Sequence, residues 1–78
     1  MPTVALFDGI KIEVFPNDHN PPHFHVTYSG EKAIIDIQRL AIIQGSLPAK
    51  QFRKVVEWAE TRQEILLIRF REQNQHLR

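Results

Sequence analysis

Alternating apolar and polar residues predict several short strands in the first part of the chain. Residues 10–15 and 23–28 both alternate, which is typical of half-buried strands. A Ser-Gly turn at 29–30 then favours a hairpin whose second strand covers residues 31–38. Residues 40–44 form a further apolar run. The pattern therefore predicts an antiparallel meander of three or four strands.

From Pro48 onward, the apolar residues follow the period of a helix. Proline suits a first helical turn, and residues 48–74 are predicted as one long helix. Its apolar stripe contains Phe52, Val55, Val56, Ala59, Leu66, Leu67 and Phe70. We expect this stripe to pack on the sheet face that carries Phe24, Val26 and Tyr28. The predicted fold is α+β, a three- to four-stranded antiparallel meander covered on one face by one long C-terminal helix.

Three further apolar residues of this helix, Trp58, Ile65 and Ile68, fall nearly opposite the stripe at about 100° per residue. A single helix on a single sheet cannot bury two opposite faces. Since tryptophan is common in interface hot spots, we interpret the three residues as a partner surface, for a homodimer or a small partner protein. The alternative is that they are scattered surface residues, which are common in soluble proteins.

Composition limits the class of protein. The 78 residues predict a single domain over 1–78, with a sheet half at 1–47 and a helical half at 48–74. The absence of cysteine excludes disulfides, a thiol nucleophile and thiolate zinc sites. No run approaches the roughly 18 apolar residues of a membrane span, and no signal segment is recognisable. We therefore expect a cytoplasmic protein.

The formal net charge of +1 conceals an uneven distribution. Residues 1–48 carry three cations and five anions, a net charge of −2, whereas residues 49–78 carry seven cations and four anions, a net charge of +3. Lys50, Arg53 and Lys54 lie in or near the first turns of the predicted helix, where backbone amides also attract anions. They predict a contact with phosphate or RNA. The alternative is a solvated helix face with local ion pairs.

Three of the four histidines lie within seven residues, beside two prolines. His23 and His25 are two residues apart on a predicted strand, so both rings leave one face with Cα atoms about 6.5–7 Å apart. These two rings can converge on a metal ion such as zinc, with His19 as third ligand and Asp18 beside it. Without a metal, His23 and His25 can act as catalytic acid and base on a phosphodiester. In the third interpretation, the histidines only shape a turn.

Four segments together resemble a known family: Phe7-Asp8-Gly9-Ile10, Asn17-Asp18-His19-Asn20-Pro21-Pro22-His23-Phe24-His25-Val26, Gly45-Ser46-Leu47-Pro48 and Glu57-Trp58-Ala59. Over essentially its whole length, the chain resembles the bacterial domain-of-unknown-function family DUF4160. The motif match carries over Asp18, His19, Pro21, Pro22, His23, His25 and Trp58. Members are often encoded beside a second small protein, as in toxin–antitoxin modules. The resemblance therefore implies a toxin-like role or a paired partner.

Three functions follow from these features. In the first, the chain is a component of a toxin–antitoxin-like module that acts on RNA or another phosphoester, with His23 and His25 as catalytic groups. In the second, it is a metal-binding module with His19, His23 and His25 as ligands. In the third, it is a non-enzymatic, dimeric interaction domain.

Overall fold

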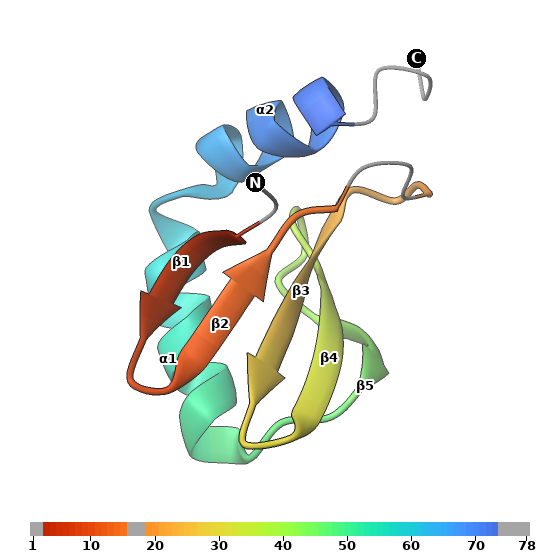
Figure 1. Cartoon of the computed structure of the whole chain (residues 1–78). Helices are drawn as coiled ribbons and strands as arrows, with labels where there is room; N and C mark the ends of the chain where they lie inside the picture. Colours follow the sequence, from red (N-terminus) through yellow and green to blue (C-terminus); the bar gives the residue numbers. More distant parts are fainter. Residues whose placement is uncertain (1–2, 16–18, 74–78) are drawn as a thin grey trace.

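The computed structural model describes residues 3–15 and 19–73, as strands followed by helices (Figure 1). The strands are β1 (Thr3–Phe7), β2 (Ile10–Glu13), β3 (His23–Tyr28), β4 (Glu31–Asp36) and β5 (Ile42–Gly45). The helices are α1 (Ala49–Glu60) and α2 (Gln63–Gln73). All strands belong to one sheet in sequence order, and each is antiparallel to the next. The predicted antiparallel meander is therefore confirmed.

Two hairpins of this sheet turn on residue pairs with a left-handed backbone. Asp8 and Gly9 have φ angles of 49° and 75°, and Ser29 and Gly30 have φ angles of 47° and 83°. Positive φ at both central residues is the mark of a type I′ turn, whose twist matches that of the paired strands. The turn chemistry therefore aligns β1 with β2 and β3 with β4.

One face of the sheet forms the core, together with α1 and α2. In Figure 1, α1 lies behind the sheet and α2 crosses near its upper end. The buried cluster consists of Ile10, Ile12, Val14, Phe24, Val26, Ile35 and Ile37 from the sheet side, and of Val55, Ala59, Leu66 and Phe70 from the helices. Burying one large apolar side chain contributes roughly 1.5–3 kcal/mol, so this cluster is the main source of stability. The α+β class and the helical cover on the Phe24 side are confirmed.

The number of strands differs from the prediction. The described residues form five strands, whereas the alternation predicted three or four. The strand without a sequence prediction is β1, whose short apolar run shows no clear alternation. Its signal is the Asp-Gly pair at 8–9, because Asp-Gly between two apolar runs strongly favours a hairpin.

The prediction of one long helix over residues 48–74 is wrong, because the helix is interrupted at Thr61 and Arg62. Thr61 has φ −93° and ψ 5°, and the Arg62 N–H donates to the Ala59 carbonyl at 2.9 Å, which closes a tight turn. α2 then begins at Gln63 in a new direction, so angular positions on α1 do not extend to α2 (Figure 1). Neither of these two helices is long and apolar enough to cross a membrane.

The end of β5 provides a test of this architecture. Gly45 has a φ angle of 84°, and a Cβ atom there would collide with the Lys32 carbonyl oxygen on β4. Gly30 has a φ angle of 83° but no atom within 4 Å of the equivalent position. We predict that Gly30→Ala lowers the free energy of unfolding by about 1 kcal/mol through backbone strain alone. Gly45→Ala should lower the free energy of unfolding by at least about twice that amount, because β4 and β5 must also move apart to admit the new Cβ atom.

Urea unfolding followed by circular dichroism measures both losses. Equal losses for the two variants would contradict the close approach of β5 to β4.

Candidate functional site

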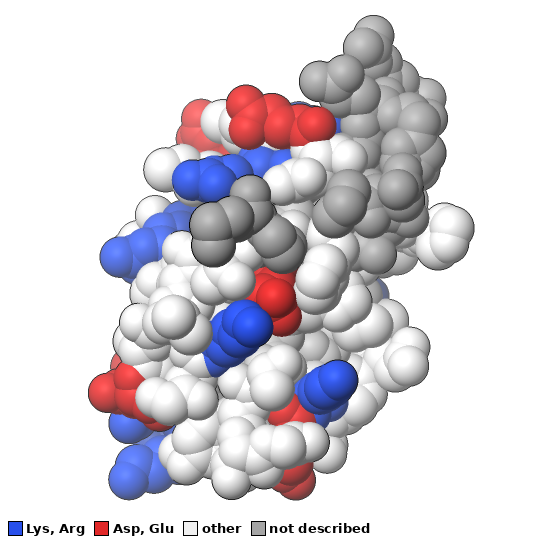
Figure 2. Space-filling model, in the orientation of Figure 1, with Lys and Arg blue, Asp and Glu red and all other residues white. Residues whose placement is uncertain are grey.

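The sheet face turned away from the helices carries the candidate site. A depression of about 240 Å³ lies on this face, over β2 to β5. Its polar lining consists of Glu13, His25, Thr27, Lys32 and Gln44. Figure 2 views the molecule from this side and shows basic and acidic side chains adjoining one another on a largely neutral surface. The alternation that buries the core residues directs these polar side chains outward.

The sheet register shows which side chains adjoin His25 in the lining of the depression. Its cross-strand partners are Glu13 on β2 and Ile34 on β4, and Ile34 is opposite Gln44 on β5. Side chains of such partners start about 4.5–5.5 Å apart at Cβ. The Glu13 side chain is only 15% exposed and forms an ion pair of 3.6 Å with Lys11. An imidazole and a carboxylate therefore adjoin on the open face.

Phe15 lies at one end of the depression, just after β2. The ring centroids of Phe15 and His25 are 4.7 Å apart, and the two ring planes are at 85° to one another. Both side chains are half-buried. The two rings therefore form an aromatic corner beside the Glu13 carboxylate.

The other histidine of the pair, His23, is buried, with 8% exposure. Its Nδ1–H donates to the Pro21 carbonyl oxygen at 2.8 Å, since a carbonyl oxygen only accepts. Its ring centroid lies 5.3 Å from that of His25 and 5.4 Å from that of Phe70 on α2. The structure thus brings the two predicted acid–base residues together, but only His25 lines the depression.

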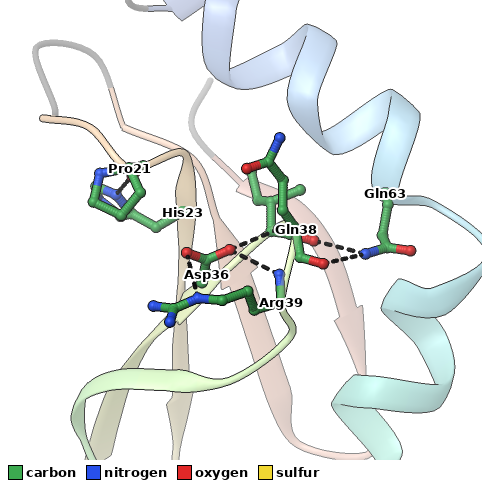
Figure 3. A network of polar contacts seen from close by, with 7 residues as sticks. Pro21, His23, Asp36, Gln38, Arg39 and Gln63 are labelled. Carbon is green, nitrogen blue, oxygen red and sulfur yellow. Dashed lines mark hydrogen bonds and ion pairs between the residues drawn. The ribbon is translucent and has the colours of Figure 1, made fainter.

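Asp36 is the cross-strand partner of His23 and is 4% exposed. Its Oδ1 accepts hydrogen bonds of 2.8 Å from the backbone N–H groups of Gln38 and Arg39, and its Oδ2 accepts one of 3.4 Å from Arg39 Nε (Figure 3). Burial raises the pKa of this carboxyl, but the backbone hydrogen bonds and the Arg39 guanidinium together outweigh burial. The pKa of Asp36 therefore lies below its ordinary value. The charged carboxylate holds the turn that follows β4.

Gln63 ties the same turn to the start of α2. Its Nε2 donates to the carbonyl oxygens of Ile37 and Gln38, at 2.9 and 3.0 Å (Figure 3). In the sequence, Gln63 interrupts the predicted apolar stripe. The structure explains the interruption, because the Gln63 amide donates hydrogen bonds to two backbone carbonyl groups. An apolar side chain at this position could not donate them.

The third predicted metal ligand, His19, is exposed. Among the residues that the structure describes, no three His, Cys, Asp or Glu side chains lie close enough to hold a metal ion. His19 therefore does not join His23 and His25 in a ligand group. Asp18, expected beside His19, lies outside the described residues.

The predicted phosphate contacts, Lys50, Arg53 and Lys54, lie at the start of α1. This helix end and the start of β3 are at opposite ends of the molecule (Figure 1). Lys50 and Arg53 are exposed, whereas Lys54 Nζ lies 3.4 Å from Asp8 Oδ2. The structure does not bring these cations to the histidine pair.

The predicted position of Trp58 opposite the core is wrong. Trp58 is half-buried and packs against the core, with ring centroids 5.8 Å from Phe7 and 6.4 Å from Phe24. The position predicted for Trp58 assumed one continuous helix. Because the helix is interrupted after α1, residues of α1 and α2 do not share a single angular register. Ile65 and Ile68 on α2 are 61% and 48% exposed. The exposed part of the predicted partner surface is therefore this pair of isoleucines.

Comparison with known proteins identifies the family. A family model described as a domain of unknown function, DUF4160, matches residues 9–71. The chain belongs to the DUF4160 family. The match includes all the side chains that line the depression, and it confirms the resemblance found in the motifs. No curated protein and no solved structure matches the chain.

Sequence reasoning found His25 in this DUF4160 domain but missed Glu13, Phe15 and Lys32. The signal is present in the alternation of residues 10–15, which places Glu13 and Phe15 on the face away from the core. Only the pairing of β2 with β3 shows that this face is also the face of His25. Alternation within one strand does not specify the neighbouring strand or its register.

The charge of Asp36 predicts a pH-dependent contribution to stability. Because its pKa is lowered on folding, the contribution is complete above the unfolded value of about 3.9 and is lost as the pH falls through the folded value. We predict that Asp36→Asn lowers the free energy of unfolding at pH 7 by about 1.5–3 kcal/mol, as expected for hydrogen bonds to a charged group. The loss should shrink as the pH falls below about 4, because Asp36 then binds a proton in the unfolded chain at a higher pH than in the folded chain, and the wild-type protein loses the contribution of the charge.

Urea unfolding at pH 7 and pH 3 measures this difference. Asp8→Asn is the matched control, because Asp8 is exposed and its pair with Lys54 should contribute about 0–1 kcal/mol. A loss in Asp36→Asn that is the same at both pH values would show that the charge of Asp36 does not hold the turn.

Proposed function

We propose that this DUF4160 domain binds RNA in the depression on its open sheet face and acts on the phosphoester backbone. The observation that carries the proposal is the joint placement of Glu13, His25 and Lys32 around one depression of about 240 Å³. Carboxylate and imidazole groups transfer protons, and an ammonium group attracts phosphate. Lys32 is exposed and forms no ion pair within the described part of the chain.

The side chains match the two proton transfers of RNA cleavage by the neighbouring 2′-hydroxyl. Glu13 takes the 2′-hydroxyl proton while the 2′-oxygen bonds to phosphorus. His25, in its protonated form, donates a proton to the 5′-oxygen while the bond between phosphorus and that oxygen breaks. The products are a 2′,3′-cyclic phosphate and a 5′-hydroxyl end. Lys32 stabilises the negative charge on the phosphoryl oxygens.

His23 has a positioning role in this proposal. It is 8% exposed and binds the Pro21 carbonyl, so its ring packs between His25 and Phe70 rather than against the substrate. A fixed neighbour limits the orientations of the His25 ring, as preorganised acid–base catalysis requires.

The family resemblance adds a cellular setting to this chemistry. A small protein that cleaves RNA inhibits growth when it is expressed alone, and the protein encoded beside it relieves the inhibition. This is the behaviour expected of a toxin–antitoxin-like module.

We predict that the purified domain converts single-stranded RNA to fragments with 2′,3′-cyclic phosphate ends, and that His25→Asn lowers the rate by about 10²–10⁴-fold. Arg53→Ala is the control, because Arg53 is exposed on α1 and is not among the residues that line the depression. Fragment ends are identified by mass spectrometry, and circular dichroism verifies the fold of each variant. Unchanged cleavage by His25→Asn excludes His25 as the acid.

A second candidate function is a homodimeric interaction domain, and α2 carries the observation that favours it. Ile65 and Ile68 are 61% and 48% exposed and three residues apart, so they are neighbours on one helix face. Two large apolar side chains in this arrangement suit the centre of a small, self-complementary interface.

If α2 forms this interface, Ile65→Lys should convert a dimer to a monomer in sedimentation velocity experiments, because a charge would be buried without a partner. Ile43→Lys is the matched control, since Ile43 is 44% exposed but lies on β5. A wild-type chain that remains monomeric at every concentration contradicts the dimer.

A further inference from the structure

On the basis of the proposed function, we propose that the substrate is an unpaired RNA strand and that one of its bases packs into the aromatic corner formed by Phe15 and His25. RNA-binding sheets commonly hold unpaired bases against exposed aromatic side chains, because every base has a flat π face. Here the two rings stand at one end of the depression that contains the proposed acid–base pair. Phe15 is then the residue that distinguishes single strands from duplexes.

The angle between the rings suits a flat ligand. The ring planes are at 85° with centroids 4.7 Å apart. A base that lies parallel to one ring therefore directs its edge toward the face of the other ring, and both stacked and edge-to-face contacts are favourable. Ile34, which is opposite His25 on β4, adds an apolar side chain to the lining of the depression.

The order of residues along the strands defines a path for the substrate across the sheet face. Phe15 lies two residues beyond Glu13 on one side of the His25 row. On the other side of that row, Lys11 and Lys32 are both opposite Thr27. Base contact and cations are thus on opposite sides of the acid–base pair, and Phe15 and Lys11 are about 13 Å apart along the strand. A strand bound at both places crosses the acid–base pair with its backbone.

A paired base cannot make the same contacts. In an A-form duplex, both faces of each base are covered by the neighbouring base pairs, and proteins contact such duplexes mainly through 2′-hydroxyl groups and phosphates. The aromatic corner would then have no π face to contact. The geometry therefore favours an unpaired strand over a duplex.

Binding of fluorescent RNA hexamers by the full chain tests the proposal. The probes are a hexamer of ordinary nucleotides, an abasic hexamer with the same backbone, and the ordinary hexamer annealed to its complement. Glu13→Gln is present throughout to prevent cleavage, because it removes the proposed base and leaves both rings of the aromatic corner in place, and fluorescence anisotropy gives each Kd. We expect the ordinary strand to bind about tenfold more tightly than the abasic strand and the duplex. Phe15→Leu should remove this preference without changing the Kd of the abasic strand, and Phe15→Tyr should restore it.

The outcomes separate this inference from the proposed function. Equal binding of the ordinary and abasic strands, weakened in both by Lys32→Ala, overturns the base contact and leaves the phosphate site in place. Tighter binding of the duplex than of the single strand also overturns the inference. If no probe binds and RNA is not cleaved, the proposed function itself fails. Circular dichroism confirms that Phe15→Leu is folded, and the recovery by Phe15→Tyr excludes a loss due to unfolding.

Discussion

Burial of only one sheet face is the constraint on which the rest of this structure depends. Alternation sends every second residue of β2, β3 and β4 toward α1 and α2, which cover that face (Figure 1). The register that buries Ile12 and Val26 therefore places Glu13 and His25 side by side on the opposite face. A shift of one residue would exchange the two sets and expose the core. The polar arrangement of the candidate site thus follows from the same energetics that stabilise the fold.

Polar contacts complete this arrangement at the upper end of the sheet. The turn after β4 is held from two sides, by the Asp36 carboxylate on its N–H groups and by the Gln63 amide on its carbonyl groups. Gln63 is the first residue of α2, so the same contacts set the start of the helix that carries Phe70. Because Phe70 packs against the His23 ring, the turn also connects the helix break to the histidine pair.

Features encoded by local periodicity were predictable from the sequence, and features that depend on contacts between distant segments were not. The Ser-Gly hairpin, the covered face and the location of His25 on the open face follow from alternation and turn chemistry. The helix break has no such local signal, since neither glycine nor proline occurs at Thr61 or Arg62. Contacts of Gln63 with a turn 25 and 26 residues earlier accompany the break. The pairing of Glu13 with His25 likewise depends on strand register.

The segment His23-Phe24-His25 shows how position along a strand separates two residues that share a face. Phe24 points into the core and is fully buried, which anchors the strand between the histidines. His23 lies at the strand end, where Pro21 and Phe70 contact it, whereas His25 lies two residues farther along and borders the depression. An apolar ring at His23 would fill the same space without the cost of desolvating an imidazole. The hydrogen bond to the Pro21 carbonyl offsets that cost and also fixes the His23 ring. Because this ring packs against His25, the same hydrogen bond helps to orient the proposed acid.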